Sequence, residues 1–319
     1  MPGEAYLGLD IGGTSVKMGL FDGDGKLLGR KRVPTPSIVD EAGFNAVTEG
    51  MKACLAEASR GFVPGDVRGA CLACPFPVPK DGVSELQSNI DMDLLGCVDA
   101  IRAVFPQAAV VCENDANAAA VGEMRLGAAR GVSDLVMITL GTGVGGGVVV
   151  DGKIVRGPRG AAGEFGHLCV NPGGGRRCGC GHDDCLEMYS SAKGLVLDYL
   201  DECRLTGQEP IKLKDGMDSY GVFMAMERGD DAAARWAVHV MCDRLAFAMA
   251  ALTVATDPAL FVIGGGPSAE FYLFGDELKS CYRKYAVGIC ADTPIVEASL
   301  GSDAGMIGAG FLAIEAAAR

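Results

Sequence analysis

The sequence predicts an α/β protein built from two related halves, and three observations support this prediction. Strand-like patterns alternate with helix-like patterns along the chain, which is typical of helices packed on sheets. Two similar segments, each a strand, a glycine turn and a second strand, begin at Leu7 and at Val136. The 319 residues, of which 49% are hydrophobic, suffice for the cores of two ordinary domains.

The two similar segments differ in sequence but share one plan. Residues 7–14 lead through a glycine turn into a strand at 16–21 and a turn at 22–26. In the same way, residues 136–143 lead into a strand at 147–150 and a turn at 151–153. This repetition indicates a two-domain chain with related halves; chance similarity between two β-hairpins is the alternative.

The elements between and after these segments follow from hydrophobic periodicity and stop signals. Strands are predicted at residues 67–74, 108–112 and 260–263, and helices at 40–59, 99–104, 116–125, 232–256 and 304–318. Asp257 and Pro258 end the longest of these helices, which is apolar enough to be buried. We expect residues 1–115 and 304–319 to form a small first domain, and residues 116–303 a larger second domain.

The overall charge narrows the classes of partner. The formal net charge is −13, from 28 basic and 41 acidic side chains, which disfavours nucleic acid or an anionic membrane as the main partner. The amino terminus lacks the basic residues and long apolar run of a signal peptide, and no run approaches the ~18 apolar residues of a membrane span. We therefore expect a cytoplasmic protein, in which most of the 13 cysteines are buried free thiols.

The first glycine turn, Asp10-Ile11-Gly12-Gly13-Thr14, has the residues of a phosphate site. Adjacent glycines let backbone amides approach an anion, and the Thr14 hydroxyl adds a donor. The Asp10 carboxylate fits beside a phosphate if a divalent cation lies between them. An ordinary tight hairpin would need only the two glycines and remains the alternative.

The second glycine turn, Gly141 to Gly147, contains G-x-G-x-x-G but does not fit a Rossmann domain. That motif should open a helix, and here a strand follows. The chain also lacks the G-x-x-x-x-G-K-[ST] of a P-loop. Two glycine hairpins, one in each half, instead predict a nucleotide held across a cleft between domains. A third glycine turn, Gly264-Gly265-Gly266, has no side chains and could lie against the bound nucleoside.

A cluster of cysteines predicts a structural zinc site. Cys178, Cys180 and Cys185 lie within eight residues in a polar loop, and His167 precedes them by eleven. Together they form a Cys₃His set, which occupies all four coordination positions of a tetrahedral zinc ion and leaves none open for catalysis. His182 is the competing fourth ligand, and buried free thiols are the alternative for the cysteines.

Several carboxylates lie where they could contact a polar ligand. Glu113-Asn114-Asp115 follows a strand at the edge where α/β folds place their sites, although Asp115 alternatively serves as a helix N-cap. Glu164 and Glu187 flank the predicted zinc ligands and would be fixed by them. Carboxylates on a rigid frame suit a polyhydroxylated ligand, because each accepts hydrogen bonds from neighbouring hydroxyls.

The motifs together resemble those of the ROK family of repressors and sugar kinases. They are Asp10-Ile11-Gly12-Gly13-Thr14, Glu113-Asn114-Asp115-Ala116-Asn117-Ala118, Gly141-Thr142-Gly143, Glu164-Phe165-Gly166-His167 and Cys178-Gly179-Cys180-Gly181 with Cys185-Leu186-Glu187. Within the family, the chain is similar to bacterial glucokinases and related hexose and N-acetylhexosamine kinases. The resemblance implies a two-domain actin-like ATPase (ribonuclease H-like) fold, with a cleft that closes over ATP and sugar, and a homodimer.

The resemblance also implies roles for matching residues. Asp115 is the general base; the sugar is bound by Asn114, Asp115, Glu164, His167, Glu187 and Asn89. Asp10 acts near Mg²⁺, and the nucleotide is bound by Gly12, Gly13, Thr14, Lys17, Gly141, Thr142, Gly143, Gly264 and Gly265. The zinc is structural and is held by His167, Cys178, Cys180 and Cys185.

The expected activity is phosphorylation of glucose by ATP. Other hexoses (fructose, mannose, allose) and N-acetylhexosamines (N-acetylglucosamine, N-acetylmannosamine) are alternatives, because Phe76 stands where the family usually has glycine and the loop residues His182-Asp183-Asp184 are unusual. Phe76 either narrows the sugar pocket or points away from it. A sugar-responsive repressor is disfavoured because the phosphate motif begins at residue 10, which leaves no room for a DNA-binding domain; a non-catalytic sugar-binding protein is a minor alternative.

Overall fold

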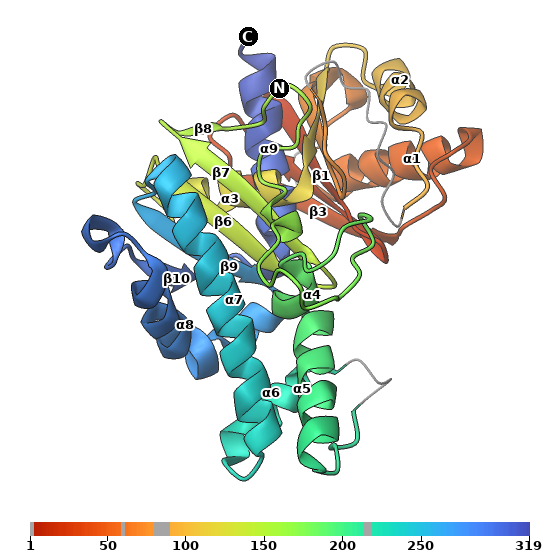
Figure 1. Cartoon of the computed structure of the whole chain (residues 1–319). Coiled ribbons are helices and arrows are strands. Elements are labelled where there is room, and N and C mark those ends of the chain that lie inside the picture. Colours follow the sequence, from red (N-terminus) through yellow and green to blue (C-terminus); the bar gives the residue numbers. More distant parts are fainter. Residues whose placement is uncertain (1–2, 59–60, 80–89, 214–217) are drawn as a thin grey trace. The chain divides into compact units, whose positions relative to one another are not determined.

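The computed structural model describes residues 3–58, 61–79, 90–213 and 218–319. The chain forms two compact units, drawn in Figure 1. The first unit comprises Met1–Gly131, Ile154–Ala162 and Leu300–Arg319, and the second comprises Val132–Lys153 and Gly163–Ser299.

The first unit contains a five-stranded sheet with the order β3-β2-β1-β4-β5. Strands β1 and β2 are antiparallel, as are β2 and β3, whereas β4 runs parallel to β1 and β5 runs parallel to β4. The bounds are Ala5–Ile11 for β1, Ser15–Phe21 for β2, Leu27–Pro34 for β3, Val67–Cys74 for β4 and Ala109–Asn114 for β5. The carboxyl ends of the three parallel strands therefore meet at one edge of the sheet.

Among the described residues, the first unit contains the α-helices α1 (Glu41–Glu57), α2 (Leu94–Val104), α3 (Asp115–Leu126) and α9 (Ala304–Ala317). Asp40 caps α1, and Asp93 caps α2 through a bond from the Gly96 backbone N–H. This second cap explains why α2 begins earlier than the predicted 99–104. The C-terminal helix α9 packs on the first unit's sheet, as the sequence predicts, and also on α3, which the sequence does not predict.

The packing of α9 against α3 depends on glycine. A Cβ on Gly308 of α9 would lie 1.7 Å from the carbonyl oxygen of Ala118 in α3. The two backbones are thus too close for any side chain at this position. The contact keeps α3 in the first unit, although the sequence places residues 116–125 in the second domain.

We expect Gly308→Ala to destabilise the protein by at least about 2 kcal/mol, because the added methyl forces the two helices apart. Urea unfolding of the variant and wild type measures the difference. Gly65→Ala serves as the control, since a Cβ there meets nothing within 4 Å, and should change stability by less than about 0.5 kcal/mol. An unchanged midpoint for Gly308→Ala would contradict the packing argument.

The second unit repeats the sheet plan of the first. Its strand order is β10-β9-β6-β7-β8, with β6 antiparallel to β7 and parallel to β9, and β10 parallel to β9. The bounds are Leu135–Leu140 for β6, Val144–Val150 for β7, Lys153–Ile154 for β8, Leu260–Gly265 for β9 and Ile295–Glu297 for β10. Strands β6 and β9 thus correspond to β1 and β4, and the prediction of two related halves is confirmed.

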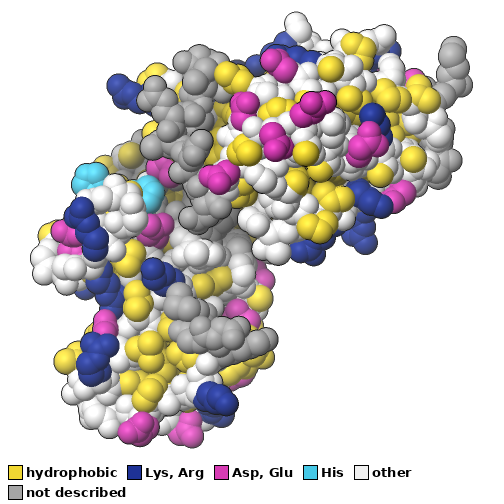
Figure 2. Space-filling model, turned by 90° about the vertical axis from the view of Figure 1, so that its right-hand side faces the viewer, with side chains coloured by type: hydrophobic (Ala, Val, Ile, Leu, Met, Phe, Trp, Pro, Cys, Tyr) yellow, Lys and Arg dark blue, Asp and Glu magenta, His cyan; other side chains and the backbone are white. Residues whose placement is uncertain are grey.

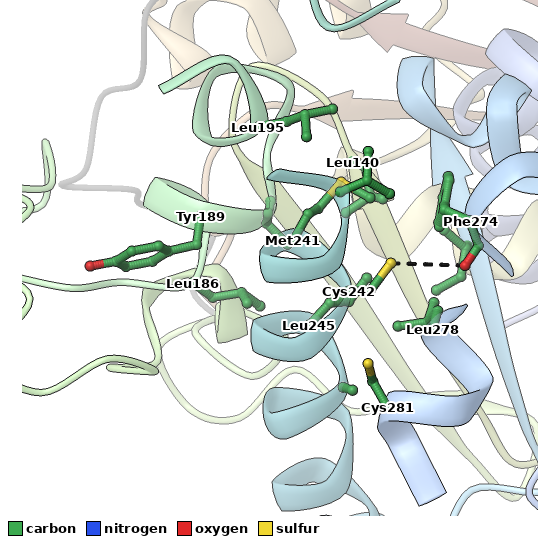
Figure 3. Close-up of a cluster of buried hydrophobic side chains, with 14 of the residues drawn as sticks. Leu140, Leu186, Tyr189, Leu195, Met241, Cys242, Leu245, Phe274, Leu278 and Cys281 are labelled. Atoms are coloured by element: carbon green, nitrogen blue, oxygen red, sulfur yellow. Dashed lines mark hydrogen bonds between the residues drawn. The ribbon is translucent and has the colours of Figure 1, made fainter. Parts of the chain in front are cut away.

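The helices of the second unit are α4 (Glu187–Ser190), α5 (Ala192–Thr206), α6 (Ser219–Arg228), α7 (Ala232–Thr256) and α8 (Phe271–Tyr285). Helix α7 is long and apolar enough to span a membrane, but 56% of its most apolar window is buried, as in the core helix of a globular protein. Figure 3 shows Met241, Cys242 and Leu245 of α7 packed among side chains of neighbouring elements. The prediction of a buried helix at 232–256 is confirmed.

Candidate active site and metal centre

The carboxyl edge of the first unit's sheet gathers most of the predicted site residues of that unit. In the strand register Asp10 of β1 lies beside Ala73 of β4, and Ala73 lies beside Glu113 of β5. Asn114 ends β5, and Asp115 begins α3 directly after it. The sheet therefore presents the Asp10 turn and the Asn114–Asp115 pair at the same edge.

Asp10 is held by Lys17 and by the start of α9. The Lys17 Nζ lies 3.3 Å from Asp10 Oδ2 and also donates to the carbonyl of Ser302. A Cβ on Gly305 would lie 3.1 Å from the Asp10 carboxyl carbon, so the first turn of α9 packs on this carboxylate. Burial raises the pKa of Asp10, and the Lys17 charge opposes that rise. Asp10 and Lys17, both predicted to act at the nucleotide, are thus direct partners.

The turn between β1 and β2 exposes its backbone. The Gly12 N–H donates to the Ser15 carbonyl at 3.2 Å and closes the turn, while Gly13 and Thr14 are exposed. A Cβ on Gly13 would meet no atom within 4 Å. Gly13 is therefore exposed with open space around it, which leaves room for an anion at the turn.

Asn114 is the residue that caps α3. Its side-chain oxygen accepts from the N–H groups of Ala116 at 3.0 Å and Asn117 at 3.1 Å. The alternative interpretation of Asp115 as the N-cap is therefore wrong: Asp115 is the first helical residue, half-buried, with Oδ1 2.7 Å from the Ala116 N–H. Within the described part of the chain, the Asn114 amide nitrogen makes no hydrogen bond, so the capping residue retains its two side-chain donors.

Glu113 and Arg156 support this edge through an ion pair that the sequence did not predict. The Glu113 side chain is 2% exposed, and its Oε1 accepts from the Asn114 N–H at 3.0 Å and from Asn117 Nδ2 at 2.9 Å. Its other oxygen pairs with Arg156 Nε. A buried carboxylate needs such partners, so Arg156 helps to fix the residue that precedes Asn114. Arg156 is far away in sequence, and no local pattern points to it.

In the second unit, the two predicted glycine sites lie on neighbouring strands. The register pairs Thr139 with Gly264 and Leu140 with Gly265. Gly265 has a φ of +91°, and a Cβ there would lie 1.9 Å from the Leu140 carbonyl oxygen, so only glycine fits. The turn Gly141-Thr142-Gly143 follows Leu140 directly, and therefore lies at the same sheet edge as Gly264 and Gly265.

The glycine turn of the second unit also contacts a predicted sugar residue. A Cβ on Gly143 would lie 2.6 Å from the Glu187 carboxylate, and the Gly141 carbonyl accepts from the Ala192 N–H at 2.9 Å. The segment that contains α4 is thus hydrogen-bonded to the glycine turn and packed against it. The predicted phosphate turn and Glu187 are brought together in one unit.

The predicted metal ligands converge. The side-chain donor atoms of His167, Cys178, Cys180 and Cys185 all lie within 4.8 Å of one another. Cys178 Sγ is 3.7 Å from His167 Nδ1, and Cys180 Sγ is 3.5 Å from Cys185 Sγ. His182 does not belong to this group, although its Nδ1 lies 3.6 Å from Cys180 Sγ. Three thiols and one imidazole around a common centre match the donor set of tetrahedral zinc.

Thiolate formation is favoured at one of these sulfurs. Burial raises the pKa of Cys180, but hydrogen bonds from His182, Cys178 and Cys185 outweigh this effect and bring it down to about 6. For Cys185, burial and the bond to Cys180 raise the pKa to about 11. A metal ligand must be deprotonated, so a cation here would bind with release of protons from the remaining thiols.

Two carboxylates flank His167. Glu164 Oε2 lies 3.9 Å from His167 Nε2, and Glu187 Oε1 lies 3.9 Å from Nδ1 of the same ring. Glu187 also accepts from the Cys178 thiol at 2.8 Å. Burial raises the pKa of Glu164, with His167 lowering it and Glu187 raising it further. Glu164, His167 and Glu187 thus form one polar cluster, as the sequence predicts for a ligand rich in hydroxyl groups.

Asp184 braces the loop of cysteines. It has a φ of +61°, and it accepts from the N–H groups of Gly175 and Arg176 at 3.0 Å and from the Tyr189 hydroxyl at 2.6 Å. The Tyr189 bond and these backbone bonds lower the pKa of Asp184 to about 2. The sequence marked this residue only as unusual; its bonds tie the loop to α4.

We expect Asp184→Asn to lower Tm by at least about 3 °C, because the amide NH₂ cannot accept from a backbone N–H. The charged form of Asp184 stabilises the fold above its unfolded pKa near 4, and that contribution is lost as pH falls from about 4 to about 2. Calorimetry across this range should show the difference from wild type shrinking with falling pH. Asp183→Asn, whose carboxylate is exposed, is the matched control; equal effects of both variants would contradict the bracing role.

Two further sequence expectations concern the sugar. Asn89 lies outside the described residues. Phe76 is 5% exposed and packs in the hydrophobic core of the first unit. Whether its ring narrows the sugar pocket stays a prediction.

On the face shown in Figure 2, the described Lys and Arg side chains are interspersed with acidic and apolar ones. That face therefore offers no continuous basic stripe among its described residues for nucleic acid.

Comparison with known proteins places these motifs in one family. The model of the ROK family matches residues 6–316. A glucokinase from Halalkalibacterium halodurans is 34% identical over 96% of this chain and 94% of that relative. An N-acetylmannosamine kinase from Escherichia coli is 32% identical over 96% of this chain and 97% of that relative.

Solved structures agree with the sequence relatives. A ROK family glucokinase from Streptomyces griseus, crystallised with glucose and AMPPNP, superposes with a TM-score of 0.76 at 33% identity, covering 98% of this chain and 99% of that one. The repeated strand order described above is the one on which the actin-like ATPase fold is built, and that fold is confirmed for this chain. With the family match over nearly the whole length, the chain belongs to the ROK family.

Proposed function

We propose that this chain transfers the γ-phosphoryl group of ATP to a hexose, with glucose as the first candidate and glucose 6-phosphate as the product. One observation carries the proposal: Glu164, His167 and Glu187 form a polar cluster, and Glu187 lies against the glycine turn at Gly143. Hydroxyl-binding groups and a phosphate-binding turn side by side are what a sugar kinase requires.

The attacking hydroxyl is prepared by Asp115, which accepts its proton as general base. The position supports this role, because Asp115 is half-buried at the start of α3 and is preceded by Asn114, which Glu113 and the cap hold in place. The Asn114 amide donates to sugar hydroxyls, as does the His167 ring N–H that does not face the zinc, and Glu164 and Glu187 accept from others. Fixed partners keep the reacting oxygen in line with the phosphoryl group.

The nucleotide phosphates are bound by backbone amides and cations rather than by a P-loop. Gly12, Gly13 and Thr14 act in the first unit, and Gly141, Thr142 and Gly143 in the second, with Gly264 and Gly265 beside the latter turn. Lys17, the ion-pair partner of Asp10, would supply a positive charge, and Asp10 would act near the Mg²⁺ that accompanies ATP. Bound Mg²⁺ neutralises charge on the phosphates during transfer.

We propose that His167, Cys178, Cys180 and Cys185 hold a structural Zn²⁺. All four positions of the metal are filled by protein, so zinc takes no part in the reaction. Its effect is positional, since the ligands His167 and Cys178 contact the sugar carboxylates Glu164 and Glu187.

A second candidate substrate is an N-acetylhexosamine, which the similarity to the E. coli N-acetylmannosamine kinase favours. One acetyl group depends on a few pocket contacts, so the shared fold does not choose between the two classes. On the family likeness, we also propose that the enzyme is a cytoplasmic homodimer that feeds glycolysis.

A coupled assay of ADP formation tests this proposal. The sugars are glucose, mannose, fructose, allose, N-acetylglucosamine and N-acetylmannosamine, each with ATP and Mg²⁺. We expect glucose to give the highest kcat/KM. A higher value for an N-acetylhexosamine would replace the substrate but keep the kinase, whereas no sugar-dependent ADP formation would leave a non-catalytic sugar-binding protein.

A further inference from the structure

A second group of metal-binding side chains lies on the helix pair α7 and α8 of the second unit. His239 comes from α7, and Glu277 and Cys281 come from α8, four residues apart and hence on one face of that helix. Their donor atoms all lie within 4.8 Å of one another. None of the three belongs to the cysteine loop or to the polar cluster around His167.

The individual distances place Glu277 between the other two. His239 Nδ1 is 2.5 Å from Glu277 Oε1, and Cys281 Sγ is 3.6 Å from the same oxygen. Tetrahedral zinc, with bonds of about 2.0–2.3 Å, separates its ligand atoms by about 3.3–3.7 Å. The sulfur and oxygen already have this spacing, and an ion would need only to part the imidazole and carboxylate by about 1 Å.

The three side chains combine a buried sulfur with two ligands that are partly exposed to solvent. Cys281 is fully buried, and Figure 3 shows its side chain leaving α8 into the space between α8 and α7. The His239 and Glu277 side chains are 46% and 44% exposed. An ion can therefore enter from solvent between two exposed ligands and reach a thiol that packing holds in place.

The charges around the group favour a dication. Glu277 and Asp243 both contribute negative charge at Cys281, and the Cys281 thiolate would add a third. Lys284 Nζ, 3.8 Å from Cys281 Sγ, opposes them with one positive charge and can donate to the bound sulfur. The other cation at this place, Arg244, pairs with Asp243, whose second oxygen accepts from the Tyr285 hydroxyl. With Glu277, Asp243 and the Cys281 thiolate set against Lys284 and Arg244, three negative and two positive charges leave a local net charge of −1.

We propose that His239, Glu277 and Cys281 form a second, three-ligand Zn²⁺ site, with water in the fourth position. One nitrogen, one oxygen and one sulfur suit zinc, which accepts all three donors, better than the hard cations Mg²⁺ and Ca²⁺, which prefer oxygen alone. Binding releases the Cys281 proton to solvent and links α7 to α8. The proposal does not depend on the kinase activity.

The test is a difference in zinc content between two forms of the full-length chain. Wild type and His239→Asn are equilibrated with buffered micromolar zinc, desalted and measured by elemental mass spectrometry. We expect wild type to hold one zinc more per chain than His239→Asn. Zinc bound by the cysteine loop is present in both forms and drops out of the difference. The comparison therefore remains valid even if the cysteine loop binds no zinc.

Two more variants test which side chains bind the zinc. Glu277→Gln should lose the same zinc, whereas Asp276→Asn, the fully exposed neighbour on α8, should keep it. All three changes are at exposed side chains, and circular dichroism verifies that each variant is folded. Equal zinc in wild type, His239→Asn and Glu277→Gln would overturn the proposal, leaving a surface ion pair beside a core thiol.

Discussion

Asp115→Asn should lower kcat for sugar phosphorylation by about 10²–10⁴-fold, the usual contribution of a positioned general base. The amide has nearly the same shape but cannot take the proton of the attacking hydroxyl. Asn114 continues to cap α3, so the helix should form normally. Because Asp115 shares sugar binding with several other groups, the Kd for glucose, measured by calorimetry, should change much less than kcat.

Asp93→Asn is the matched control for this prediction. Asp93 also stands at a helix start of the first unit, where it caps α2, and asparagine is an equally good cap. The control should retain wild-type kcat. Near-normal turnover of Asp115→Asn would remove the general-base assignment, and equal loss in both variants would point to a folding effect instead.

Removal of the proposed zinc from the cysteine loop should raise KM for glucose by about 10-fold or more, since its proposed ligands contact Glu164 and Glu187, the carboxylates proposed to bind the sugar. Cys185→Ser is the variant of choice, because Cys185 is fully buried and its sulfur lies 3.5 Å from that of Cys180. The measurement is KM for glucose together with zinc content. Loss of zinc with KM unchanged would contradict the bracing role.

Cys169→Ser is the control for the loop. Cys169 is exposed, pairs with Cys185 through a backbone bridge and is not part of the ligand group, so its thiol should be dispensable. This variant should keep both zinc and KM. A loss of zinc on Cys169→Ser would show that the ligand set has been assigned wrongly.

The sequence predicted the fold well wherever the signal was local. Glycine turns after apolar runs located β1 and β6, and their repetition predicted the two equivalent sheets. The boundary of the first domain was less predictable, because α3 stays with it through the contact of Gly308 with Ala118. That contact joins residues from opposite ends of the chain, and no periodicity reveals it.

The candidate site was likewise predictable where the sequence signal was local, and not where it depended on long-range packing. The cysteine spacing and the flanking glutamates predicted a cluster that the structure brings together around His167. The buried pair of Glu113 with Arg156 was not predicted, since the ionic partner of a buried carboxylate depends on tertiary packing. The alternative interpretation of Asp115 as the cap was wrong by one position, because one residue of uncertainty at a helix start exchanges the cap, Asn114, for the first helical residue.

The most direct test of the account is to identify the product. The full-length chain is incubated with ATP, Mg²⁺ and glucose, and the phosphorylated product is analysed by phosphorus NMR and mass spectrometry alongside ADP. The account predicts glucose 6-phosphate and ADP in equal amounts, formed by Asp115→Asn at least about 100-fold more slowly than by wild type. Formation of ADP without any sugar phosphate, or formation of sugar phosphate by Asp115→Asn at the wild-type rate, would contradict it.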